Sequence, residues 1–362
     1  MFDYIAYFCL AFFIASVLTP IVKCLAKMLL ILDHPDERKV HIESKPRLGG
    51  AAIAMSFLFC LVITSVYDGD TSTLFSPLSE GNTAAVLQAH PFGIRFFVGA
   101  LIIFLLGAWD DWKGTNARVK FFWQIVAALI VIVNQPKFGI LTGFGLTGTV
   151  YSVIDVGIGV FWVAYLCNAF NLIDGLDGLS AGTTFFACIG LCMLAFSIGK
   201  TALAMLIILM AGAVLAFLQY NRFPAQIFMG DSGSLFVGFC LSIFSLNILS
   251  AGTLSHMSFL APFIALGLPL LDTTWAIVRR YAAGKGLFSA DKGHIHHLMM
   301  ERSTHNGAVN RLFGINLLLC IAVGIIARFS NALGLWGHIA IYGLVIFGAY
   351  VLLIQLKKVK SR

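Results

Sequence analysis

Aspartates recur in short groups beside glycine, amide and basic residues, a composition suited to binding phosphate and a divalent cation. The first group, GAWDDWKGTNARVK, places Asp110 next to Asp111 and adds Lys120 downstream. Adjacent carboxylates repel each other, so a nearby cation or metal ion would be needed to keep both ionised. The alternative for such a pair alone is ordinary solvation at the end of a helix.

The second group, NAFNLIDGLDGLS, carries four oxygen-bearing side chains at steps of three: Asn168, Asn171, Asp174 and Asp177. On a helix this spacing turns successive side chains by only about 60°, which predicts one polar stripe. The intervening glycines permit close backbone approach or a break in the helix. The alternative is a set of polar contacts between neighbouring helices.

The third group, FPAQIFMGDSGS, places Asp231 directly before an apolar run. A helix beginning there would offer free N–H groups and the positive end of its dipole. Asp231 alone could equally be an N-cap. Taken together, three groups of carboxylate and amide oxygens favour Mg²⁺ over zinc, because Mg²⁺ prefers oxygen ligands.

The fourth group, GKGLFSADKGHIHHLMM, contains His294, His296 and His297 in a basic setting. No cysteine accompanies the histidines, which disfavours zinc, and contacts to phosphate or sugar hydroxyls fit better. An earlier basic segment, DHPDERKVHIESKPRLGG, adds Lys45 and Arg47. Its alternative explanation is the positive charge expected of any cytoplasmic loop.

The composition identifies the elements that must hold these residues as membrane helices. Of 362 residues, 59% are hydrophobic and 11% charged, whereas about 25% are charged in ordinary soluble domains. The net charge of +7 is then explained by membrane orientation and by contact with anionic lipid headgroups. Nucleic acid is not expected as a partner.

Apolar runs divide the chain into eleven segments of about the 20 residues that a hydrocarbon core requires. We therefore predict an all-α integral membrane protein with a single domain over 1–362. The predicted spans are 2–22, 49–67, 93–109, 119–135, 151–168, 179–198, 201–219, 234–252, 257–278, 311–329 and 335–356.

The distribution of lysine and arginine predicts the orientation. With eleven spans, 20 of the 24 basic residues fall in loops on one side, and the exceptions are Arg95, Lys137, Lys200 and Arg328. The positive-inside rule places the richer side in the cytoplasm, the N-terminus outside and the C-terminus inside. All four motifs then lie at the cytoplasmic face, where ionisable groups at membrane depth indicate function.

These motifs, in this order, resemble those of the polyprenyl-phosphate N-acetylhexosamine-1-phosphate transferases. The resemblance covers nearly the whole chain, and HIHH is similar to the undecaprenyl-phosphate N-acetylglucosamine-1-phosphate transferase branch. The branch that transfers phospho-MurNAc-pentapeptide usually has consecutive histidines, which Ile295 interrupts here.

The resemblance implies an enzyme of the bacterial inner membrane that transfers N-acetylglucosamine-1-phosphate from UDP-N-acetylglucosamine to undecaprenyl phosphate. The reaction would release UMP, require Mg²⁺ or Mn²⁺, and begin a surface polysaccharide such as O-antigen. UDP-GalNAc and UDP-MurNAc-pentapeptide stay open as donors, and a homodimer stays open as the assembly. The rival from another class, a transporter of an anionic solute, would place its polar groups near the membrane midplane.

The resemblance also assigns roles to residues. Asp110, Asp111 and Asp231 are expected to be catalytic, with Asp231 and Asn171 as metal ligands and Asp110 or Asp111 at the lipid phosphate. That aspartate would act as a general base or as a covalent nucleophile, and we favour direct attack by the lipid phosphate. Substrate contacts are expected from Lys45, Lys120, Asn168, Asn171, Asp174, Asp177, His294, His296 and His297.

Overall fold

A computed structural model describes residues 2–34, 44–67, 93–133, 148–250, 258–284, 286, 293–301, 303–329 and 332–360. Of the four basic residues predicted on the non-cytoplasmic side, Lys137 lies outside these ranges. Within them the chain is almost entirely helical, with one two-stranded antiparallel sheet of β1 (Leu32–Asp33) and β2 (Lys45–Pro46). The helices are α1 (Phe2–Met28), α2 (Gly49–Tyr67), α4 (Ile94–Lys113), α5 (Ala117–Ile132), α6 (Gly148–Ile173), α7 (Leu179–Ser197), α8 (Thr201–Asn221), α9 (Gly230–Leu249), α10 (Ala261–Ala265), α11 (Gly267–Ala282), α12 (Ile295–Met300), α13 (His305–Phe329) and α14 (Gly334–Lys360), with a 3-10 turn at Ser258–Leu260.

Each of the eleven predicted ranges overlaps a helix. By length and composition, six helices among the described residues can cross a membrane, namely α1, α6, α7, α8, α9 and α13. Shorter apolar stretches lie in α2 and α14. An almost entirely helical, multi-pass architecture is therefore confirmed, whereas the count of eleven spans and their orientation stay predictions.

The predicted span 257–278 differs from the structure, because the helix is interrupted at Leu266 between α10 and α11. Pro269 lies in the first turn of α11, where a missing N–H costs no intrahelical hydrogen bond. The sequence therefore begins a new helix at this point, and α11 packs against α6 and α13.

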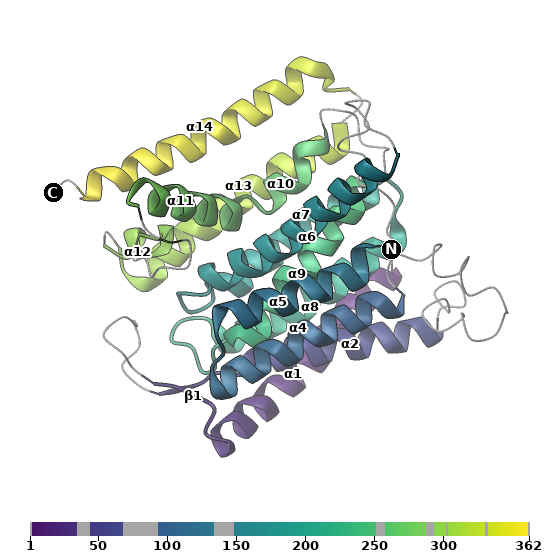
Figure 1. The fold of residues 1–362 in the computed structure, drawn as a ribbon, viewed down its shortest axis with the longest axis vertical. Helices are drawn as coiled ribbons and strands as arrows, with labels where there is room; N and C mark the ends of the chain where they lie inside the picture. Colours follow the sequence, from purple (N-terminus) through teal and green to yellow (C-terminus); the bar gives the residue numbers. More distant parts are fainter. Residues whose placement is uncertain are drawn as a thin grey trace.

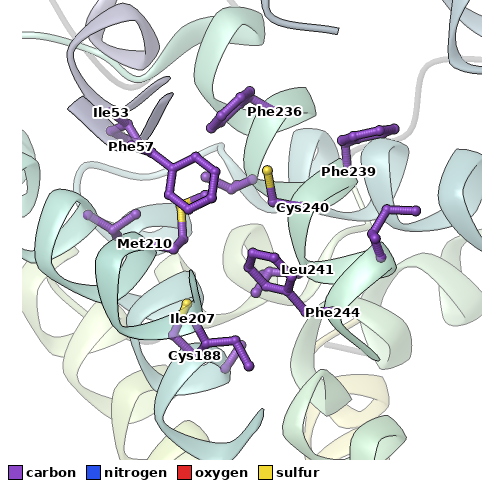
Figure 2. Close-up of a cluster of buried hydrophobic side chains, with 14 of the residues drawn as sticks. Ile53, Phe57, Cys188, Ile207, Met210, Phe236, Phe239, Cys240, Leu241 and Phe244 are labelled. Atoms are coloured by element: carbon purple, nitrogen blue, oxygen red, sulfur yellow. The ribbon is translucent and has the colours of Figure 1, made fainter. Parts of the chain in front are cut away.

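The helix α9 forms the centre of the bundle, and all of its residues are buried. α2, α4, α6 and α7 pack around it. Figure 2 shows Phe236 and Phe244 of α9 near Phe57 of α2, and the ring centroids of Phe57 and Phe236 are 5.9 Å apart. Such packing fixes α9, and with it the position of Asp231 in its first turn.

Two glycines let neighbouring backbones approach the first turn of α9. A Cβ at Gly50 of α2 would collide with the backbone of Gly233, and one at Gly107 of α4 would collide with that of Asp231. Because Gly107 lies one turn before Asp110 and Asp111, this close contact carries both carboxylates to the start of α9.

Figure 1 shows β1, α12 and the C-terminus on one side of the bundle and the N-terminus on the opposite side. Large apolar side chains are exposed on the outer helices, including Phe13 of α1 and Leu344 of α14. Contact with lipid explains these exposed side chains, since in water they would be costly.

Candidate functional site

The predicted site residues converge at the end of the bundle that carries β1 and α12. At its centre is Asp231, whose side chain is 7% exposed and forms ion pairs with two basic side chains. Arg47 Nη2 donates to Asp231 Oδ1 at 2.8 Å, and Lys120 Nζ donates to Oδ2 at 2.9 Å. Lys120 also lies 3.3 Å from Asp110 Oδ1. The segment between β2 and α2 therefore meets α4, α5 and α9 in one ionic cluster.

Asp111 is bound more tightly into the structure than Asp110. Its side chain is fully buried and accepts hydrogen bonds from the backbone N–H groups of Asp231 at 2.8 Å and Ser232 at 3.0 Å. Arg47 Nε lies 3.0 Å from the same carboxylate. Asp111 thus caps α9 from another helix, satisfying two donors that a helix N-terminus leaves free.

Arg47 lies among four carboxylates, those of Asp33, Asp110, Asp111 and Asp231. Burial disfavours its charged form, but the four anions outweigh burial and raise the pKa of Arg47 above its ordinary value. The guanidinium therefore stays charged. Its backbone pairs with Phe228 in a short parallel bridge, which places the side chain immediately before α9.

The cluster fits a divalent cation by both charge and donor type. Its four carboxylates face two basic side chains, Arg47 and Lys120, so acidic groups outnumber basic ones in the cluster. Oxygens of Asp110, Asp111 and Asp231 all lie within 4.8 Å of one another. Carboxylate oxygens are the ligands that Mg²⁺ prefers.

The two amides predicted from α6 lie in different surroundings. Asn171 Nδ2 donates to Ser234 Oγ of α9 at 3.0 Å, and Asn171 also lies against the Asp231 carboxylate. Asn168 Nδ2 instead donates to Gln124 Oε1 of α5 at 2.8 Å and to the carbonyl of Ala164. Asn171 therefore belongs to the ionic cluster, whereas Asn168 joins two helices.

The single polar stripe predicted on one helix is wrong, because α6 ends at Ile173. Asp174 and Asp177 lie in the turn that follows, and Gly178, with φ of 81°, adopts the left-handed conformation that ends this turn. Asp177 Oδ2 accepts the N–H of Ala225 at 2.8 Å and lies 3.8 Å from Lys45 Nζ. The turn is thereby tied to the loop before α9.

Asp174 remains without a hydrogen-bonding or ionic partner for its carboxylate within the described chain. Burial, reinforced by the negative charge of Asp231, raises the pKa of Asp174 well above its ordinary value, although Arg47 acts in the opposite direction. A cation bound nearby would favour the ionised form of this carboxyl group.

The three predicted histidines lie on and just before α12, beside the same turn. His296 is 2% exposed, and a Cβ at Gly175 would collide with its ring. Burial and the neighbouring His297 lower the pKa of His296 to about 3, so its ring is neutral near pH 7. Its Nδ1 finds no hydrogen-bond partner among the described residues.

Four residues that complete this region were not predicted as site residues from the sequence. These are Arg47, which was named within a basic segment but given no role of its own, together with Asp33, Asp272 and His305. Asp272 binds His294, and His305 Nε2 accepts the N–H of Asp177 at 3.2 Å. Asp272 had a detectable signal, since it is a lone carboxylate within the predicted span 257–278.

A bundle of apolar helices with carboxylates, basic side chains and histidines gathered at one end defines a polytopic membrane protein with a charged candidate site at that end. The glycosyl transferase family 4 model matches residues 94–249. These residues include α4 to α9 and therefore most of the ionic cluster.

Three relatives narrow the assignment. A probable undecaprenyl-phosphate N-acetylglucosaminyl 1-phosphate transferase of Bacillus subtilis is 33% identical over 91% of this chain and 86% of its own. A decaprenyl-phosphate N-acetylglucosaminephosphotransferase of Mycobacterium leprae is 32% identical over 92% and 84%. An undecaprenyl-phosphate alpha-N-acetylglucosaminyl 1-phosphate transferase of Escherichia coli is 27% identical over 89% and 83%. The chain belongs to this family of polyprenyl-phosphate N-acetylglucosaminyl 1-phosphate transferases.

Proposed function

We propose that the protein transfers N-acetylglucosamine-1-phosphate from UDP-N-acetylglucosamine to undecaprenyl phosphate. The products are UMP and undecaprenyl-diphospho-N-acetylglucosamine. The observation that carries the proposal is the cluster of Asp110, Asp111, Asp231, Arg47 and Lys120. In a chain of this family, it is the arrangement that two anionic phosphates would require.

In the proposed reaction, an oxygen of the lipid phosphate attacks the phosphorus that bears the sugar. The bond from this phosphorus to the bridging oxygen of the nucleotide breaks, and UMP leaves with the electron pair. Since both reactants are anions, neutralising their charge and aligning them supplies most of the rate enhancement. Arg47 and Lys120 are positioned to exchange their carboxylate partners for phosphate oxygens.

Mg²⁺, or Mn²⁺ in its place, would be held by Asp231 and Asn171 together with the donor diphosphate. When bound, the metal would neutralise charge that develops on the phosphate oxygens. The support is the excess of negative charge in the cluster and the contact of Asn171 with Asp231. Asp174 lies close enough to respond to the same charge.

Asp110 is the better candidate for the acceptor phosphate, because both oxygens of Asp111 already accept backbone hydrogen bonds. A lipid phosphate carries its own negative charge near neutral pH, so little general-base assistance is needed. Direct attack is therefore favoured over a covalent aspartyl-phosphate intermediate, which would require Asp110 itself to act as the nucleophile.

The site is proposed to lie at the cytoplasmic face of a bacterial inner membrane, in a chain of eleven spans with its N-terminus outside. Trp109 and Trp112 are exposed beside Asp110, and Lys113 lies over both rings at 5.0 and 4.3 Å. Exposed tryptophan with lysine is typical of the membrane–water interface. An interfacial site would allow a membrane-bound lipid to meet a soluble nucleotide sugar.

The donor and the pathway are the least constrained parts of the proposal. The names of the relatives favour N-acetylglucosamine, and UDP-GalNAc or UDP-MurNAc-pentapeptide would support the same chemistry. The product would begin a surface polysaccharide such as O-antigen. Transport of an anionic solute is the weaker alternative, since the charged cluster lies at helix ends rather than midway along them.

The test uses purified full-length protein with undecaprenyl phosphate and each of the three UDP-sugars, with and without Mg²⁺. UMP should appear with UDP-N-acetylglucosamine only when divalent cation is present, and its release without metal would overturn the proposal. Asp231→Asn should lower turnover by about 10²-fold or more while the protein stays folded. Asp3→Asn is the control, because it makes the same substitution in the first turn of a helix, at an exposed position of α1.

A further inference from the structure

A second buried carboxylate, Asp272 of α11, lies outside the ionic cluster and has a role that the proposed chemistry does not explain. It is 1% exposed. One oxygen, Oδ2, lies 2.8 Å from His294 Nδ1, and the other, Oδ1, accepts the backbone N–H of Ile295 at 2.7 Å. Asp272 therefore fixes both the His294 ring and the beginning of α12.

The contacts that hold His294 continue through His296 to the turn between α6 and α7. The rings of His294 and His296 stack, with centroids 5.7 Å apart and planes 12° apart. His296 in turn lies over Gly175, where no side chain could fit. A continuous set of contacts thus links Asp272 to the turn that carries Asp174.

The helix that bears Asp272 is itself anchored. The Tyr165 hydroxyl of α6 donates to the Leu270 carbonyl at 3.1 Å and lies 2.7 Å from Thr274 Oγ1, so α11 is joined to α6 on both sides of Asp272. Farther along α11, Arg279 lies against Gly293. The position of the Asp272 carboxylate relative to α6 is therefore fixed.

We propose that Asp272 is a positioning residue, which holds residues 293–301 against the Gly175 turn so that His294 meets the diphosphate of the nucleotide sugar. With Nδ1 directed to Asp272, the His294 ring can contact a ligand only through Nε2. No described residue occupies Nε2. The inference rests on the proposed function for the identity of the ligand, but not for the contacts that hold the segment.

Asp272→Asn tests the inference, because it keeps the size of the side chain but places an amide against His294. In the full-length protein, we expect the KM for the UDP-sugar to rise about tenfold, the lower end of the effect seen when the partner of a metal-binding histidine is removed. The KM for undecaprenyl phosphate should not change. Hydrogen–deuterium exchange should accelerate over residues 293–301 but not over α11.

Two further variants separate positioning from general damage. Ser245→Ala removes the hydrogen bond from Trp162 of α6 to α9 without touching α11 or the histidines, and it should leave the KM for the UDP-sugar within about twofold of wild type. In a His294→Ala background, Asp272→Asn should have little additional effect on KM, because Asp272 acts through that ring. Additive effects, or an equal effect of Ser245→Ala, would overturn the inference.

The exchange measurement keeps this inference separable from the proposed function. If wild-type protein released no UMP with any donor, the proposed function would fail, and exchange over residues 293–301 would still decide whether Asp272 holds the segment. Unchanged exchange in Asp272→Asn would refute the positioning role. Faster exchange with an unchanged KM would refute its connection to the nucleotide.

Discussion

Asp110 and Asp111 are neighbours in sequence, yet their surroundings give them different roles. Asp111 accepts two N–H groups from the first turn of α9 and contacts Arg47 with a fully buried side chain. Asp110 is in contact with Lys120 and, at 3.9 Å, with Arg47. Removing Asp111 therefore leaves buried donors without acceptors, whereas removing Asp110 does not.

We predict that Asp111→Ala lowers the free energy of unfolding by about 1–2 kcal/mol, the usual cost of losing a helix cap. Asp110→Ala should cost less stability but should lower turnover as strongly as Asp111→Ala. Thermal unfolding in detergent, measured alongside UMP release, distinguishes the two variants. Equal loss of stability in both would show that Asp111 is not the cap of α9.

Residue types predicted which side chains lie together at the site better than they predicted the contacts that these side chains make. Asp231, Lys120 and Asn171 were selected from their motifs, and they do lie together. Arg47 was named within a basic segment but was given no individual role, because a basic residue in a predicted cytoplasmic loop already has an explanation. Its role depends on a backbone bridge to Phe228, a long-range pairing that no local pattern reveals.

At the scale of elements, the site depends on how closely α4 approaches the first turn of α9. Gly107 provides this approach, since a Cβ there would meet the backbone rather than a movable side chain. The apolar pattern could locate α4 and α9 along the chain. It could not show that they touch at Gly107, because glycine in an apolar helix has several explanations.

Gly107→Ala should therefore destabilise the protein by about 1–3 kcal/mol, the range for overpacking a well-filled interior, and should lower turnover by displacing both aspartates. Gly157→Ala is the matched control, because a Cβ on this glycine of α6 would meet no atom within 4 Å. It should be neutral or slightly stabilising, since alanine favours helix. A loss in Gly157→Ala as large as in Gly107→Ala would contradict the explanation.

The boundary between α6 and α7 shows the limit of periodicity. Steps of three from Asn168 to Asp177 fit a helix, but the chain leaves the helix after Ile173. Gly178 adopts φ of 81°, and the Asp177 carboxylate accepts the backbone N–H of Ala225 in the loop between α8 and α9. Side-chain to backbone contacts of this kind compete with helical hydrogen bonding, so spacing alone overestimates helix length.

At the scale of the whole molecule, the most buried helix lies at the centre of the bundle, and the charged cluster lies at one end of it. α9 is enclosed on all sides, while the outer helices expose large apolar side chains such as Phe13 and Leu344. The ionic cluster and the exposed Trp109 and Trp112 lie together at the end of α4. This arrangement agrees with a membrane interface at that end, on the side where 20 of 24 basic residues are predicted.

The predicted orientation can be tested at the two ends of α9, the helix that carries Asp231. Fusions that end after Asn221, the last residue of α8, and after Ser250, just beyond α9, should report opposite sides of a bacterial inner membrane. Green fluorescent protein should fluoresce on the Asn221 fusion, because that end is predicted to be cytoplasmic, and alkaline phosphatase should be active on the Ser250 fusion. If both fusions reported the same side, α9 would not cross the membrane. If the sides were exchanged, the ionic cluster would face away from the cytosolic nucleotide sugar, and the proposed reaction could not occur there.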